Sequence, residues 1–190
     1  MFIQTEATPN PEVLKFLPGQ DVTGTGTREF KSEAEAAGSP LAKALFELGG
    51  VSRVFFGPDF LTVTKTAERD WSHLKAPILA EIMDHFTASG GQMGAVGAAE
   101  SFDDEEVYEG ETAQIVAEIK DLLDTRIRPA VAQDGGDILF SKFEPDSGTV
   151  WLHMRGACAG CPSSAATLKA GVENMLKHYV PEVTRVEQTV

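Results

Sequence analysis

The spacing of hydrophobic residues in the first half of the chain predicts a mixture of strands and helices. Short β-prone runs bounded by Gly, Pro and Asn predict four strands, at 2–5, 13–17, 51–56 and 60–66. Apolar residues that recur every three or four positions predict two helices, at 40–48 and 71–86. Ser39 and Pro40 supply an N-cap and a first-turn proline for the first helix, and Pro77 is expected to divide the second into a short and a long piece.

The second half of the chain has a different order of elements. A helix is predicted at 111–128, with an acidic start and a basic end that complement the helix dipole. Alternating residues predict strands at 138–143 and 149–154, joined by a hairpin turn. A helix at 162–179 and a short strand at 183–186 follow, so the expected order is α-β-β-α-β. The residues expected to face inward on the last helix are Ala165, Leu168, Val172, Met175, Leu176 and Tyr179.

Composition and the distribution of charge predict two small folded domains. The 190 residues are 42% hydrophobic and 24% charged, as in globular rather than disordered or fibrous proteins. Between 87 and 111 lie seven of the 29 acidic residues and no basic ones, in a stretch that is otherwise rich in Gly and Ala. We therefore expect an α/β (α+β) protein with a domain at 1–86, a flexible acidic linker at 87–110 and a second domain at 111–190.

Net charge and the N-terminal sequence exclude some binding partners and indicate where the protein is located. A formal charge of −13 argues against sequence-independent binding to nucleic acid or to an anionic membrane, because both need basic patches. No apolar run approaches the roughly 20 residues that cross a bilayer. The N-terminus has neither the apolar stretch of a secretory signal nor the Arg-rich bias of a transit peptide, so a cytoplasmic protein is expected.

The two cysteines are the strongest candidates for chemistry. Cys158 and Cys161 form a C-x-x-C motif in the segment 155–164, which joins a predicted strand to the last predicted helix. Pro162 suits the first helical position, so Cys161 is expected at the N-cap. The helix dipole and Arg155 are then expected to lower the pKa values of the thiols. Glycines within the motif allow the backbone to bend around a metal site.

Three interpretations of this pair remain open: metal or cluster ligation, a dithiol redox centre, and an inert buried pair. A thioredoxin-like redox domain needs further strands and a helix, for which only about ten residues remain after Tyr179. For ligation, one chain offers two thiolates, whereas a zinc site or an iron-sulfur cubane usually has four protein ligands. Two such loops facing across a two-fold axis would complete the set, in an exposed and easily dismantled site. The histidines are expected to be surface or sheet residues rather than ligands: His73, His85, His153 and His178.

Several motifs of the chain resemble those of the Nfu/NifU family. The second domain resembles the NifU C-terminal domain through Arg126-Ile127-Arg128-Pro129, Asp134-Gly135-Gly136-Asp137 and Gly156-Ala157-Cys158-Ala159-Gly160-Cys161-Pro162-Ser163-Ser164, of which the last is highly specific. The first domain resembles, through 3–11 and 56–65, the domain found ahead of it in bacterial and mitochondrial Nfu proteins. The resemblance covers nearly everything except the predicted linker.

The resemblance implies an iron-sulfur cluster carrier or scaffold with no enzymatic turnover. It implies a 4Fe-4S cluster held between two subunits, with Cys158 and Cys161 as ligands, and delivered to apo-proteins. Expected partners are apo iron-sulfur client proteins, other cluster-assembly proteins and, on cluster binding, a second copy of the chain; the first domain is expected to dock clients or assembly proteins. A thiol-disulfide redox protein and a zinc-bridged structural dimer are the alternatives. The Met1 start is expected of a bacterial cytoplasmic protein, or of a processed form in the mitochondrial matrix.

Overall fold

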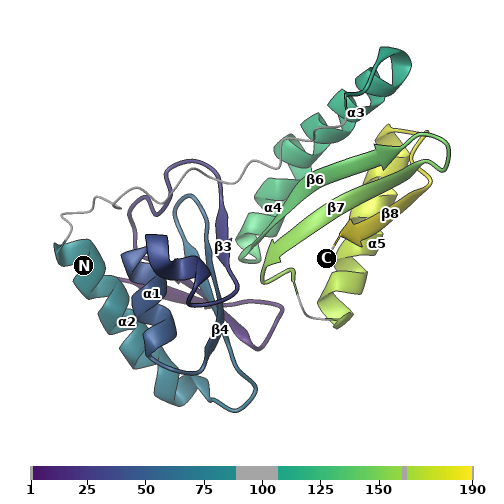
Figure 1. Cartoon of the computed structure of the whole chain (residues 1–190). Coiled ribbons are helices and arrows are strands. Elements are labelled where there is room, and N and C mark those ends of the chain that lie inside the picture. The colour runs from purple at the N-terminus through teal and green to yellow at the C-terminus, as the bar shows by residue number, and fades with distance from the viewer. Residues whose placement is uncertain (1, 89–106, 160–161, 190) are drawn as a thin grey trace. The chain divides into compact units, whose positions relative to one another are not determined.

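The chain forms two compact units, 1–100 and 101–190, which we describe separately. The computed structural model describes residues 2–88, 107–159 and 162–189, without the side chains of 162–165 (Figure 1). The predicted linker therefore lies mostly outside the described residues, and its flexibility stays a prediction. Both units combine helices with an antiparallel or mixed sheet, which confirms the α+β class.

The first unit is a five-stranded antiparallel sheet whose helices share one hydrophobic core with it (Figure 1). The strands follow the order β1-β2-β5-β4-β3. Their bounds are β1 Gln4–Ala7, β2 Val13–Leu17, β3 Arg28–Phe30, β4 Val51–Phe56 and β5 Leu61–Lys65. The helices are the short 3-10 turn η1 Glu35–Gly38, α1 Pro40–Glu47 and α2 Trp71–Ala88. The predicted hairpin is confirmed, because β1 pairs antiparallel with β2.

Two features of the first unit differ from the sequence expectation. Strand β3 was not predicted, since three residues are too few to show a period. Pro77 does not divide the second helix, because α2 is a single helix with this proline inside it. The proline removes one backbone hydrogen bond, yet residues on both sides of it, such as Leu74 and Ile78, are buried in the same core and hold the helix together. Ser39 caps α1 as predicted: its Oγ accepts a hydrogen bond from the Ala42 N–H at 3.4 Å.

The second unit is a three-stranded mixed sheet that packs against its helices (Figure 1). The elements are α3 Gly110–Leu122, the π-helical turn η2 Leu123–Ile127, α4 Arg128–Gln133, β6 Gly136–Glu144, β7 Thr149–Gly156, α5 Pro162–Tyr179 and β8 Arg185–Thr189. β6 pairs antiparallel with β7, and β8 runs parallel to β7 on its other side. The predicted α-β-β-α-β order is confirmed, with the first helical segment divided into α3, η2 and α4.

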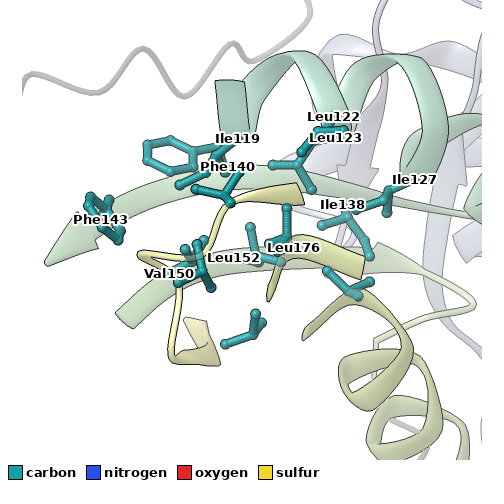
Figure 2. Close-up of a cluster of buried hydrophobic side chains, with 14 of the residues drawn as sticks. Ile119, Leu122, Leu123, Ile127, Ile138, Phe140, Phe143, Val150, Leu152 and Leu176 are labelled. Atoms are coloured by element: carbon teal, nitrogen blue, oxygen red, sulfur yellow. The ribbon is translucent and has the colours of Figure 1, made fainter. Parts of the chain in front are cut away.

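The core of the second unit lies between the sheet and the helices (Figure 2). Ile119 and Leu123 from the helical segment belong to one hydrophobic cluster with Phe140 and Leu152 from the sheet. Leu176 from α5 belongs to the same cluster. Of the six residues expected to face inward on α5, Val172 and Leu176 are buried, whereas Leu168 and Met175 are half-buried. The side chain of Ala165 lies outside the described residues.

Tyr179 was expected in this core and is instead 41% exposed. It is the last residue of α5, where the helix end faces solvent. The guanidinium of Arg126 lies 4.9 Å from its ring centroid and donates a hydrogen bond to its hydroxyl at 3.1 Å. A cation-π contact at the surface therefore takes the place of the expected burial.

Tyr108 belongs to the second unit although it precedes the predicted start at 111. Its ring packs against the core, and its hydroxyl accepts a hydrogen bond from the backbone N–H of Phe143 at 2.8 Å. Strand β6 is at the edge of the sheet, so this hydroxyl satisfies one backbone donor that β7 does not. No helix among the described residues is long and apolar enough to cross a membrane.

Candidate functional site

Cys158 lies in the tight loop that follows β7 and precedes α5. The Ala157 N–H donates to the Gly135 carbonyl and the Ala159 N–H donates to the Gly156 carbonyl, each at 3.1 Å. Gly156 has a φ of 63°, in the left-handed region that glycine adopts at low cost. These contacts tie the loop to the start of β6. Cys161 lies outside the described residues, so its predicted place at the N-cap of α5 stays a prediction.

The Cys158 thiol rests directly on Gly136. Gly136 begins β6 and pairs with Gly156 at the end of β7. A Cβ atom on Gly136 would lie 2.4 Å from the Cys158 Sγ and 2.8 Å from the Arg155 carbonyl oxygen, both closer than real Cβ contacts. Only glycine therefore leaves room for the sulfur in this position. We call the space beside the Gly136 Cα, which the sulfur fills, the Gly136 recess.

Cys158 is buried in the single chain, whereas the exposed site predicted from the sequence is one shared between two copies. The residue is 6% exposed and belongs to the hydrophobic core of the second unit. The reason is that Gly136 and Gly156 bring the ends of β6 and β7 close enough for the loop to fold its sulfur inward. In this state, the thiol packs as a small hydrophobic group.

The surroundings of Cys158 also reverse the expected effect on its pKa. The pKa of the Cys158 thiol is raised to about 12, mostly by burial and in smaller part by the Asp134 and Asp137 carboxylates. The sequence suggested that the helix dipole and Arg155 would lower it. That expectation is wrong for Cys158 because loss of hydration and two carboxylates act against the thiolate.

The buried Asp137 carboxylate is held beside this loop by an ion pair with the half-buried Arg128. The guanidinium of Arg128 donates from Nε to Asp137 Oδ1 at 2.8 Å and from Nη2 to Oδ2 at 3.0 Å. The Ile138 N–H also donates to Asp137 Oδ1, at 2.9 Å. Hydrogen bonding to Asp137 and then to Asp124 raises the pKa of Arg128, so the guanidinium stays charged. The pair fixes the first turn of α4 to the start of β6, next to Gly136.

Sequence reasoning named the residues of this arrangement without assigning them to the site. Asp134, Gly136, Asp137 and Arg128 were noted only as parts of motifs, 20 or more residues before the cysteine. The available signal was the glycine pair itself, since an adjacent Gly-Gly before a strand indicates close approach of another backbone. The position of the sulfur on Gly136 depends on strand register, which the motif does not contain.

Histidines and carboxylates do not complete a metal site within the part of the chain that the structure describes. No group of three or more His, Cys, Asp or Glu side chains comes together there in a metal-binding arrangement. His153 lies on β7, where its Nδ1 is 3.5 Å from the Thr189 hydroxyl. His178 stacks edge-on against Tyr179 at the far end of α5, and His73 and His85 belong to the first unit.

The raised pKa of Cys158 predicts slow alkylation of this thiol in the folded, metal-free protein. In a Cys161→Ser variant of the full chain, we expect the iodoacetamide reaction rate to keep rising past pH 9.0, towards an inflection at about 12. The same protein in denaturant should show the ordinary inflection near 9.0. Since the folded pKa exceeds the unfolded one, the contribution of this thiol to stability is present below pH 9 and is lost as pH rises towards 12. A folded-state inflection below pH 9.0 would contradict the burial of the thiol.

Comparison with known proteins places both units in one family. Residues 3–90 match the family described as "Scaffold protein Nfu/NifU N terminal", and residues 119–187 match the "NifU-like domain". The human mitochondrial NFU1 iron-sulfur cluster scaffold homolog is 51% identical over 100% of this chain and 72% of its own length. The chain belongs to the Nfu/NifU family.

Other relatives extend the similarity. NifU-like proteins 4 and 5 of Arabidopsis thaliana, both named as mitochondrial, are 52% and 50% identical over 99% of this chain, which spans 66% and 68% of their lengths. The solution NMR structure of a NifU-like protein from Saccharomyces cerevisiae matches 51% of this chain and 87% of its own, with 28% identity and a TM-score of 0.46. The human and Arabidopsis thaliana relatives are named as mitochondrial, and both expected locations of this chain, the bacterial cytoplasm and the mitochondrial matrix, stay predictions.

Proposed function

We propose that the chain is an iron-sulfur carrier that binds a 4Fe-4S cluster through Cys158 and Cys161 at the interface of two copies and passes it to apo-proteins. The observation that carries the proposal is the position of Cys158, three residues before Cys161. It lies in the loop that follows β7, which a hydrogen bond to the Gly135 carbonyl anchors to the residue before β6. Membership of a family whose relatives are named as cluster scaffolds supports it.

The number of ligands supports a shared site. A 4Fe-4S cluster is usually held by four thiolates, and the chain has two cysteines. Two copies related by a two-fold axis supply four, with each chain contributing the same pair. Because each chain then holds only half of the ligands, loss of either cysteine pair separates the copies.

Cluster delivery is ligand exchange, without any change of oxidation state. A thiol of the client protein binds an iron atom as thiolate, the iron bond to Cys158 or Cys161 breaks, and the proton of the incoming thiol passes to the departing cysteine sulfur. The chain ends the step with protonated cysteines and no net chemical change, so it acts as a carrier rather than an enzyme. We further propose that the first unit docks clients or assembly proteins.

The environment of Cys158 weighs against the thiol-disulfide alternative. Nucleophilic cysteines of dithiol oxidoreductases have lowered pKa values, because the thiolate is the reactive form. Burial and two carboxylates raise the pKa of Cys158 instead. A cargo-binding thiol does not need this reactivity in its empty state, since metal binding itself displaces the proton.

Anaerobic reconstitution of the full chain with iron and sulfide tests the proposal. We expect a brown protein with about four irons per dimer, a 4Fe-4S Mössbauer signature, and monomer-to-dimer conversion in sedimentation velocity that follows cluster content. Incubation with an apo-enzyme that needs such a cluster should activate it. A colourless protein with stoichiometric zinc would instead indicate the zinc-bridged dimer, and cysteines that cycle to a disulfide in a monomer would indicate the redox protein.

A further inference from the structure

We propose that the Gly136 recess is a resting place for the Cys158 side chain in the empty carrier, and that return of the sulfur to this recess favours cluster release. Gly136 is thus a positioning residue, which sets how firmly the cargo is held. The inference rests on the proposed function, since it requires Cys158 to be a cluster ligand.

The empty state is defined by close packing around one sulfur atom. The Cys158 Sγ lies 2.4 Å from the position that a Cβ of residue 136 would take, and Cys158 is 6% exposed within the core of the second unit. The hydrogen bond from the Ala157 N–H to the Gly135 carbonyl ties the loop to the residue before β6. Burial of the sulfur in this position therefore adds to the stability of the empty chain.

The loaded state needs a different position for the same sulfur. A cluster that takes thiolates from two chains lies between them, outside the core of either, and a metal–sulfur bond is only about 2.3 Å long. The sulfur cannot lie in the recess and bind an iron atom of a shared cluster at the same time. Loading therefore withdraws Cys158 from the recess, and the burial energy lost at that moment is regained when the cluster leaves.

Burial of the sulfur in the recess should shift the equilibrium between the loaded and the empty chain modestly towards the empty chain. Full burial of a small apolar side chain changes an equilibrium by about tenfold, which suits a carrier that must bind its cargo and also give it up. A residue larger than glycine at position 136 would exclude the sulfur and remove this bias, since its Cβ would lie 2.4 Å from the Cys158 Sγ. Cluster loading would then cost less burial energy, and the loaded chain would hold its cluster longer.

Gly136→Ala tests the proposal, with Gly171→Ala as the matched control. Gly171 lies in α5, and an added Cβ there meets no atom within 4 Å. In the cluster-free Cys161→Ser background, we expect Gly136→Ala to bring the alkylation rate of Cys158 to within about threefold of the denatured value, while Gly171→Ala leaves the protection intact. In the otherwise unaltered full chain, Gly136→Ala should slow cluster transfer to excess dithiothreitol by about tenfold.

Results of two kinds would overturn the proposal. Either Cys158 is unprotected in the folded, empty Cys161→Ser protein, or Gly136→Ala folds and releases its cluster at the rate of the Gly171→Ala control. If the unaltered chain takes up no cluster at all, the proposed function fails, while the alkylation arm still measures the recess.

A second measurement avoids the risk that Gly136→Ala disturbs the hairpin, where the new Cβ would also lie 2.8 Å from the Arg155 carbonyl oxygen. Hydrogen exchange of the unaltered full chain can be compared between the empty and the cluster-loaded protein. We expect the amides at 136–138 to exchange faster after loading, because the departing sulfur uncovers the start of β6. Equal or slower exchange at these amides in the loaded protein would overturn the proposal.

Discussion

Cys158→Ala and Cys161→Ala should each abolish cluster binding and cluster-dependent dimerisation. Each substitution removes two of the four ligands from a symmetric dimer, and the two that remain cannot hold a cubane. Iron content after anaerobic reconstitution should fall from about four per dimer to the level of the protein reconstituted without sulfide. Iron analysis, visible absorption and sedimentation velocity measure the three losses in the same sample.

His153→Ala is the matched control for the ligand assignment. His153 lies on the same strand, β7, and is a common type of metal ligand, yet it contacts Thr189. We expect this variant to load normally. A Cys158→Ala protein that still holds a stable cluster would contradict the assignment of that ligand, and a His153→Ala protein without a cluster would add a ligand that the count of thiolates did not include.

Removal of the half-buried Arg128 guanidinium should produce the largest loss of stability. Arg128→Met leaves the Asp137 carboxylate, whose side chain is 4% exposed, without two charge-assisted hydrogen bonds. Breaking a buried ion pair costs about 3 kcal/mol, and part exposure of the Arg128 side chain keeps the expected value at this lower end. Urea unfolding monitored by Trp151 fluorescence in a Trp71→Phe background measures the second unit specifically, since each unit has one tryptophan.

Lys177→Met is the corresponding control at the surface. Its ammonium group lies 2.6 Å from Glu173, and both side chains are well exposed compared with Asp137. Exposed pairs contribute about 0.5 kcal/mol, so this variant should unfold near the midpoint of the unaltered protein. Equal losses for the two variants would show that burial of Asp137 adds nothing to the strength of its ion pair.

The secondary structure was largely predictable because local patterns determine it. Val150, Leu152 and Met154 alternate with more exposed residues along β7, and the sequence shows that alternation directly. Pro162 begins α5, as a proline at the first helical position predicts. Exceptions occurred where the decisive contact comes from elsewhere: Pro77 is tolerated because the core holds α2 on both sides of it.

The sequence predicts which residues form the candidate site, but it does not predict the environment of Cys158. Two cysteines in a glycine-containing C-x-x-C motif indicate ligation, and their small number suggests a shared cargo. Whether Cys158 is exposed or buried depends on the register of β6 against β7, which places Gly136 opposite Gly156. That register is a property of the assembled sheet, and a motif of ten residues cannot contain it.

The sequence by itself determined the order of the elements in the second unit, the family and the two thiols that are the candidate ligands, because each of these depends on residue type and on short spacings. Tertiary structure alone decided the environment of Cys158. Burial raises the pKa of its thiol most, and Asp134 and Asp137 add to this effect. These two carboxylates and Gly136, which contacts the sulfur, are more than 20 residues away along the chain. Burial and electrostatic interaction act through space, so they exist only after β6 and β7 have paired.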